Sequence, residues 1–115
     1  MQIIELDTNK GLFLESSFSI NSATTTAVIA ARIGFITRVY KMFLTVGAAQ
    51  TVDIKDGSTS LSGGPLGFAS SGVFNLHFDQ TPWFTTTANS ALNLTTTTTG
   101  VTVGRLYYTQ QRSFE

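Results

Sequence analysis

The sequence contains no cysteine and only one histidine, and charged residues make up 12% of it. Without cysteine the chain has no disulfide and no thiolate metal site. Seven acidic and seven basic residues give a net charge of zero, whereas a nucleic-acid binder normally has a basic excess. No combination of side chains suited to catalysis is visible. We therefore predict a protein that is not an enzyme, needs no cofactor, does not bind nucleic acid and acts by contact with a partner.

Long apolar runs are also absent. The longest nearly uncharged apolar stretch, 26–31, is far too short to span a bilayer. The first ten residues, MQIIELDTNK, carry acidic residues early and lack the basic and apolar regions of a secretory signal peptide. We expect synthesis in the cytoplasm and no membrane partner. At 115 residues the chain has the length of a single domain with one hydrophobic core.

What the sequence does contain is alternation of apolar and polar residues with a period of two, which is typical of half-buried strands. The longest such segment is 35–46, and further strands are expected over 50–55, 59–61, 72–78, 92–98 and 101–109. Strong turn signals lie at Asp56-Gly57, Gly63-Gly64-Pro65 and Gly100. No long segment has the period of a helix. The pattern predicts an all-β fold, an antiparallel β-sandwich of jelly-roll or immunoglobulin-like type.

The alternation also predicts which side chains face the core. In the strand over 72–78, Phe78 is expected to point inward and His77 outward. The core is predicted to comprise Tyr40, Met42, Leu44, Val52, Ile54, Phe74, Leu76, Leu92, Leu94, Leu106 and Tyr108.

The chain divides into two zones. Residues 32–115 hold the regular strands of the sandwich. In residues 1–31 a short strand is expected to open at Ile3 and Ile4, and Leu12–Ile20 is predicted to be a second strand. Residues 24–31 are either a strand or an extended arm. This N-terminal zone either joins a sandwich or lies across a neighbouring subunit.

The titratable residues give no sign of a catalytic or metal site. His77 has no partner acid or nucleophile indicated by the sequence and is predicted to be exposed. Asp56 precedes a turn glycine, Asp53 is an outward strand residue, and the spacing of a calcium loop is missing. Asp79 stands alone. We therefore predict no catalytic and no metal-binding residues.

The aromatic loop Thr81-Pro82-Trp83-Phe84 is the most distinctive recognition candidate. Exposed tryptophan is favoured at binding hot spots and at sugar platforms. The structural alternative is a plug that closes one end of the sandwich. The threonine run 95–99 is interpreted as a solvated strand edge or ladder.

Five segments follow one another in a recognisable order: RVYKMFLTV at 38–46, AQTVDIKDGSTSLSGGPL at 49–66, TPWFTTTA at 81–88, ALNL at 91–94 and VGRLYY at 103–108. They resemble a family of small β-sandwich proteins that is frequent in tailed-phage genomes. Its pattern is a long first strand, then K-x-G-x-x-x-L-x-G-P-L, P-W-F-x-T-x-x-x-x-x-L-N-L and G-x-L-x-Y. The chain departs from it by an extra glycine at Gly63-Gly64 and by Asn89-Ser90 where glycine is common. The resemblance covers about residues 32–110.

Members of this family resemble virion structural proteins, chiefly capsid decoration or cement proteins, which are small, β-rich and often trimeric. The resemblance implies a homo-oligomer, a trimer, that binds the major capsid protein on the outer surface of a tailed-phage capsid and stabilises it against internal pressure. The alternative function is a tail-fibre or lectin-like module that binds a glycan receptor through Trp83. The candidate contacts to capsid or sister subunits are Phe13, Leu14, Phe18, Arg32, Arg38, Trp83 and Phe84.

Overall fold

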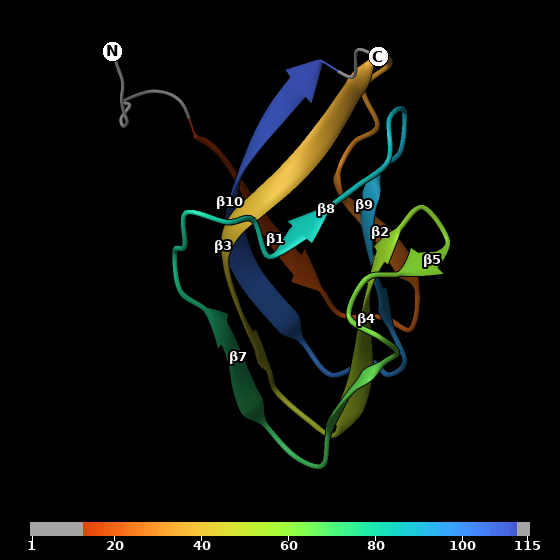
Figure 1. Ribbon diagram of the computed structural model, residues 1–115. Coiled ribbons are helices and arrows are strands. Elements are labelled where there is room, and N and C mark those ends of the chain that lie inside the picture. The colour runs from red at the N-terminus through yellow and green to blue at the C-terminus, as the bar shows by residue number, and fades with distance from the viewer. Residues whose placement is uncertain (1–12, 113–115) are drawn as a thin grey trace.

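The computed structural model describes residues 13–112, which form ten β-strands and no helix (Figure 1). The strands are β1 (Leu14–Ile20), β2 (Thr25–Ile29), β3 (Phe35–Val46), β4 (Gln50–Asp56), β5 (Thr59–Ser60), β6 (Leu66–Phe68), β7 (Gly72–Leu76), β8 (Phe84–Thr85), β9 (Leu92–Thr96) and β10 (Thr102–Arg112). The predicted all-β fold is confirmed. Only β6 and β8 were not expected, because they are too short for alternation to reveal them.

The strands form two antiparallel sheets that pack against each other. Sheet A has the order β1-β10-β3-β7, with β8 also paired with β3. Sheet B has the order β2-β9-β4-β5, with β6 also paired with β4. In Figure 1 the long strands β3 and β10 lie side by side, β7 is at the lower left, and the strands of sheet B are on the right.

The connectivity is that of one long hairpin rolled into two layers. β1 pairs with β10, β2 with β9, β3 with β7, and β4 with β5 and β6, so that each pair is nested inside the one before it. Successive strands from β1 to β4 alternate between the two sheets. This nesting is jelly-roll connectivity. Of the two sandwich types predicted from the sequence, the structure therefore has the jelly roll.

The hairpin between β4 and β5 depends on a glycine. Asp56 pairs with Thr59, which leaves Gly57 and Ser58 as the two turn residues. Gly57 has a φ of 61°, in the left-handed region, where a side chain costs about 1–2 kcal/mol. The turn predicted at Asp56-Gly57 is confirmed.

The core combines apolar side chains from both sheets. Most predicted core residues have no exposed surface: Met42, Leu44, Val52, Ile54, Leu92, Leu94 and Leu106. Three more, Phe74, Leu76 and Tyr108, pack partly buried against these. The prediction omitted Ile20, Val28, Ile29, Val39 and Val46, which are also buried.

Tyr40 is an extra residue in β3. Tyr107 of β10 pairs with Lys41, and the next residue, Tyr108, pairs with Val39, so Tyr40 has no opposite partner. Two residues facing one form a β-bulge, which locally bends the strand and redirects its side chains.

The bulge shifts the alternation of β3 by one residue. Thr37 and Val39 are buried on one side of it, whereas Met42 and Leu44 are buried on the other. The prediction that Tyr40 belongs to the core is wrong, because the period of two does not run unbroken through the strand. Tyr40 lies on the opposite face of sheet A.

The end of β7 requires a second correction. The strand stops at Leu76, two residues earlier than predicted, and Phe78 is 55% exposed instead of inward. His77 is exposed, as predicted. Once the strand ends, alternation no longer determines where the following side chains point.

The described part of the N-terminal zone belongs to the sandwich of its own chain. β1 pairs with β10 from Leu14 to Ile20, at one edge of sheet A. β2 pairs with β9 at one edge of sheet B. The strand expected at Ile3 and Ile4 lies outside the described residues. An exchange of this zone between subunits stays a prediction.

Candidate interaction surface

The face of sheet A that is turned away from the core carries several large apolar side chains. The strand register places Lys41 beside Tyr107 and Phe43 beside Arg105 on this side. Further along, Val103 and Val73 flank Thr45 from either side. We call this side the outer face; it comprises Phe13, Glu15, Tyr40, Lys41, Phe43, Val73, Phe78, Val103, Arg105 and Tyr107.

Three aromatic rings form a cluster at the bulge. The ring centroids of Phe13 and Tyr40 are 5.4 Å apart with an interplanar angle of 76°, and those of Phe13 and Phe78 are 5.5 Å apart at 89°. Tyr40 and Phe78 lie 6.3 Å apart at 28°. Edge-to-face pairs of this kind are favourable beyond the area they bury. The cluster therefore joins segments from three distant parts of the chain on the outer face.

A hollow of about 240 Å³ adjoins this cluster. Phe13, Lys41, Phe78 and Tyr107 line it. The Lys41 ammonium lies 5.5 Å from the centroid of the Tyr107 ring, within the range of a cation–π contact. The hollow thus has aromatic walls and a cation beside it.

The other charges of the outer face are an ion pair on β10 and β1. Arg105 Nη1 lies 2.9 Å from Glu15 Oε2, and both side chains are about half exposed. A hydrogen bond with Tyr107, and then the charge of Glu15, raise the pKa of Arg105. Within residues 13–112, no other ion pair is formed. Lys41 therefore has no carboxylate partner in the described part of the chain.

The predicted contact residues are divided between the surface and the core. Phe13 belongs to the aromatic cluster, and Leu14, which follows it, is 44% exposed. Phe18 and Phe84 instead pack partly buried against the core. The alternation of Phe18 with Ser17 and Ser19 could have placed it inward, whereas Phe84 directly follows Trp83 and has no such signal.

The two predicted arginines lie near the end of sheet A where β3 begins. The Arg32 guanidinium is 3.8 Å from the centroid of the Phe35 ring. Arg38 Nη1 donates a hydrogen bond of 2.6 Å to Gln111 Oε1 across the strand pair. Both residues are exposed or half-exposed and retain access to a partner.

Trp83 lies beside β3 at the junction between β7 and β8. Its indole N–H donates to the carbonyl of His77 at 2.7 Å, and its backbone N–H donates to the carbonyl of Val39 at 2.8 Å. The side chain is still 45% exposed. Trp83 therefore fixes the loop after β7 and keeps part of its ring on the surface.

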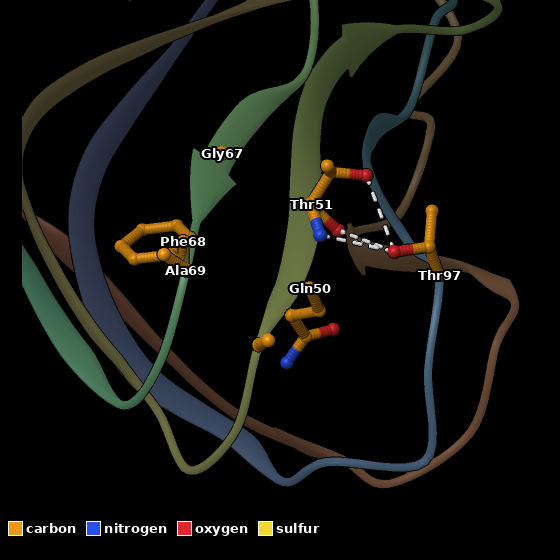
Figure 2. A pocket seen from close by; sticks show the side chains of 7 residues that line it. Gln50, Thr51, Gly67, Phe68, Ala69 and Thr97 are labelled. Carbon is orange, nitrogen blue, oxygen red and sulfur yellow. Dashed lines mark hydrogen bonds between the residues drawn. The ribbon is translucent and has the colours of Figure 1, made fainter.

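The outer side of sheet B has a different chemistry. It is built from hydroxyls that bond to one another, such as Thr25 Oγ1 and Thr95 Oγ1 at 2.8 Å. A hollow of about 520 Å³ lies here between β4, β6 and the end of β9 (Figure 2). On its rim Thr97 Oγ1 accepts hydrogen bonds from the backbone N–H and the hydroxyl of Thr51, at 2.9 and 3.2 Å.

The side chain of Gln50 closes the inner end of this hollow. It is buried, and its amide donates to Thr102 Oγ1 at 2.7 Å and to the carbonyl of Gly100 at 3.2 Å. Gln50 Oε1 has no hydrogen-bond partner within residues 13–112, whereas the Gln50 amide and the hydroxyls of Thr51 and Thr97 are engaged within the protein. Although it is the larger of the two hollows, it has fewer groups available to a partner than the outer face of sheet A.

The acidic residues of the sandwich hold turns and loops in place. Asp53 Oδ1 accepts hydrogen bonds from the hydroxyls of Ser60 and Ser62 at 2.7 and 3.3 Å. Asp56 accepts from the backbone N–H of Thr87 at 2.9 Å. Burial alone would raise the pKa of Asp56, but hydrogen bonds from Ser90 and Thr87 outweigh it and lower this pKa below its usual value.

Residues 13–112 lack two further features. No three histidine or acidic side chains lie close enough together to hold a metal ion. This part of the chain also contains no helix with the length and apolarity needed to cross a membrane.

Comparison with known proteins does not add a family to this description. No protein-family model matches the chain, and no curated protein matches it significantly. The interaction surface therefore rests on the geometry alone. Of its members, sequence reasoning had singled out Phe13 but not Tyr40, Lys41, Phe78 or Tyr107. Tyr40 and Lys41 are adjacent in a strand and both half-exposed on the same side, which indicates a bulge; only the strand register reveals it.

Proposed function

We propose that this protein is a virion structural protein, a decoration or cement protein that binds the outer surface of a tailed-phage capsid and stabilises it against internal pressure. The observation that supports this most directly is the outer face of sheet A, where Phe43, Val73, Phe78 and Val103 are exposed on a jelly-roll sandwich. Exposed apolar surface of this kind marks contact with another macromolecule. The resemblance of residues 32–110 to small tailed-phage proteins supplies the partner, the major capsid protein.

The stabilisation follows from mass action. A molecule that binds only the assembled lattice shifts the equilibrium between intact and separated capsid subunits toward the intact form. A single module can bind weakly if it engages several subunits, since each further contact is intramolecular. We therefore place the protein on the virion, after synthesis in the host cytoplasm.

The proposed assembly is a homo-oligomer, a trimer. Within residues 13–112, each sheet of the sandwich ends in strands that have a neighbour on one side only: β1, β7 and β8 in sheet A, and β2, β5 and β6 in sheet B. Open edges of this kind favour contacts between subunits. Sedimentation of the purified protein at micromolar concentration should give about three times the mass of the 12.4 kDa chain. A monomer under these conditions would contradict the trimer.

The capsid partner is tested with capsids assembled without the protein. Purified protein should bind to them and raise the temperature at which they break open. Immunogold labelling of virions should place it on the head. Labelling at the tail tip, or the absence of any affinity for capsids, would refute the decoration role.

A glycan-binding module of a tail fibre is the second candidate, because Trp83 keeps 45% of its surface exposed. Binding to a glycan array that is lost in Trp83→Ala would support it. Because Trp83 also donates a hydrogen bond to His77, Trp83→Phe is the control: it removes the N–H and keeps a ring for stacking.

A further inference from the structure

The outer face of sheet A combines an exposed apolar area with a positive charge. Val73 is 69% and Phe78 is 55% exposed. Val73 and Val103 flank Thr45 of β3 in the strand register, and Phe43, two residues before Thr45, is also exposed. Neighbouring apolar side chains that stay exposed on a small protein indicate a binding surface. The face is thus suited to a partner that is apolar where it meets these side chains.

The charges of this face are mostly cationic. Lys41 lies beside the hollow. Arg38, which is not one of the residues of the outer face, adds a cation nearer the start of the same strand, where it donates a hydrogen bond to Gln111. Arg105 is also positive, but Glu15, the one carboxylate that residues 13–112 place on this face, pairs with it at 2.9 Å. An acidic partner would therefore meet complementary charge at Lys41 and Arg38.

A second copy of this chain fits the face less well. A two-fold contact between two outer faces would bring the cations of one copy toward those of the other, and like charges at an interface are costly. Contact with sheet B of another copy offers few free acids. There the carboxylate of Asp53 already accepts hydrogen bonds from Ser60 and Ser62, and that of Asp56 from Thr87.

We propose that the outer face of sheet A is the docking surface of this protein, and that its occupant is an acidic protein segment that inserts one large apolar side chain into the hollow between Phe13, Lys41, Phe78 and Tyr107. This inference deepens the proposed function and rests on it for the source of the segment, a capsid subunit. The side of sheet B with its bonded hydroxyls then faces away from the partner.

The size of the hollow fits this occupant. At about 240 Å³ it is smaller than the roughly 300–1,000 Å³ of sites that enclose small-molecule ligands. It has room for one side chain between aromatic walls. A carboxylate next to that side chain in the segment would lie near the Lys41 ammonium. A large side chain that fills a well-packed pocket and is shielded from water is the usual form of an interface hot spot.

The test compares two charge reversals on opposite sheets. Lys41→Glu alters the outer face, and Lys55→Glu makes the same charge change on β4 of sheet B. Affinity for undecorated capsids should fall about tenfold or more in Lys41→Glu and change less than about twofold in Lys55→Glu. Binding of the wild-type protein should also weaken when ionic strength rises from about 0.05 M to about 0.5 M.

A second pair of variants tests the apolar anchor. Phe78→Ser removes a wall of the hollow, whereas Ile33→Ser removes an apolar side chain that is 88% exposed in the connection between β2 and β3. Phe78→Ser should lose about tenfold in affinity and Ile33→Ser less than about twofold. Thermal unfolding midpoints of all four variants show whether each is still folded.

The outcomes separate the inference from the proposed function. If the wild type binds capsids and the outer-face variants bind equally well, the docking surface is wrong while the decoration role stands. Sedimentation provides a further check: loss of self-association in Phe78→Ser, with capsid affinity unchanged, would show that a second copy covers the face and would overturn the proposal.

If the wild type does not bind capsids, the decoration role fails and a peptide decides the inference. The probe is a synthetic peptide in which glutamate alternates with phenylalanine and leucine. It should shift backbone amide resonances of β3 and β10, and Lys41→Glu should abolish these shifts. Shifts confined to sheet B, or equal shifts with an analogue in which lysine replaces glutamate, would overturn the proposal.

Discussion

Gly104 occupies a point in β10 where the neighbouring strands leave no room for a side chain. A Cβ added there would overlap the carbonyl oxygen of Phe43 and the ring of Phe18. Because the carbonyl belongs to the backbone of β3, relief would require the central strand pair to separate. The ring of Phe18 covers the space that a side chain would otherwise fill, which explains why Phe18 is not part of the outer face of sheet A.

The corresponding prediction is that Gly104→Ala lowers the free energy of unfolding by about 1–3 kcal/mol, as overpacking does in other cores. Gly67→Ala is the matched control, because nothing lies within 4 Å of a Cβ added at Gly67 in β6. Urea unfolding of both variants provides the measurement. A Gly104→Ala protein as stable as Gly67→Ala would show that β10 and β3 are less closely paired than described.

Asp56 supplies a pH-dependent contribution to stability. Its carboxylate accepts hydrogen bonds from the backbone N–H of Thr87 at 2.9 Å and from the Thr87 hydroxyl at 3.3 Å. Hydrogen bonds from Ser90 and Thr87 lower the pKa of Asp56 below its usual value of 3.8, despite the opposing effect of burial. A carboxyl with a lowered pKa in the folded state stabilises the protein above its unfolded pKa. That contribution is lost as pH falls through the folded pKa.

We therefore expect Asp56→Asn to lose about 1 kcal/mol at neutral pH, since the site is partly exposed to solvent. Below a pH of 3.8 the difference between wild type and variant should shrink as Asp56 itself becomes protonated. Asp79→Asn is the control, because Asp79 accepts a hydrogen bond from its neighbour Gln80 in an exposed loop. Denaturant unfolding across this pH range measures both. A difference that stays constant down to the lowest pH would contradict the assignment.

At the scale of elements, the bulge at Tyr40 determines which side chains of β3 face the core and which face outward. It allows one strand to bury Val39 before the bulge and Leu44 after it, and to place the half-exposed Tyr40 and Lys41 on the outer face between them. Without the extra residue, one of the two halves of the strand would turn its buried side outward. The outer face of sheet A therefore depends on a local irregularity in the longest strand.

This arrangement predicts a specific order of stabilities. Leu44→Ala should cost about 2–5 kcal/mol, because Leu44 is fully buried in the core. Tyr40→Ala should cost only about 1 kcal/mol, the loss of its contacts with the rings of Phe13 and Phe78. Calorimetric or denaturant unfolding of the two variants compares them directly. The reverse order would mean that alternation runs unbroken through β3 and that the outer face is wrongly assigned.

Elements with regular alternation could be predicted from the sequence, and irregular ones could not. Phe35–Val46 was predicted with its observed bounds, and the turn at Gly57 follows from a residue that tolerates positive φ. The bulge at Tyr40 depends on pairing with β10, a strand more than sixty residues away in the chain. The exposure of Phe78 depends on where β7 ends. The candidate surface lies at these two irregular points. Its aromatic cluster could therefore not be derived from the alternation of apolar and polar residues alone.

At the scale of the whole molecule, the two sheets present opposite chemistries to the surroundings. Sheet A exposes Phe43, Val73 and Phe78 together with cations, whereas sheet B exposes hydroxyls that are bonded within the chain. A sandwich that buries both inner faces in one core holds these two outer faces rigidly apart. Such a module is suited to bind a partner with one side while the other meets water.

If the protein binds only the assembled capsid, linkage predicts how stabilisation depends on concentration. The stabilising free energy is RT ln(1 + [L]/Kd), which keeps rising after all sites are filled, by about 1.4 kcal/mol for each tenfold increase in free protein. The disruption temperature of decorated capsids should therefore continue to increase with the logarithm of free protein above saturation. Light scattering during heating, at several protein concentrations, measures it. A disruption temperature that stops rising once the sites are full would show that the protein also binds separated capsid subunits with similar affinity, and stabilisation by selective binding to the lattice would then be excluded.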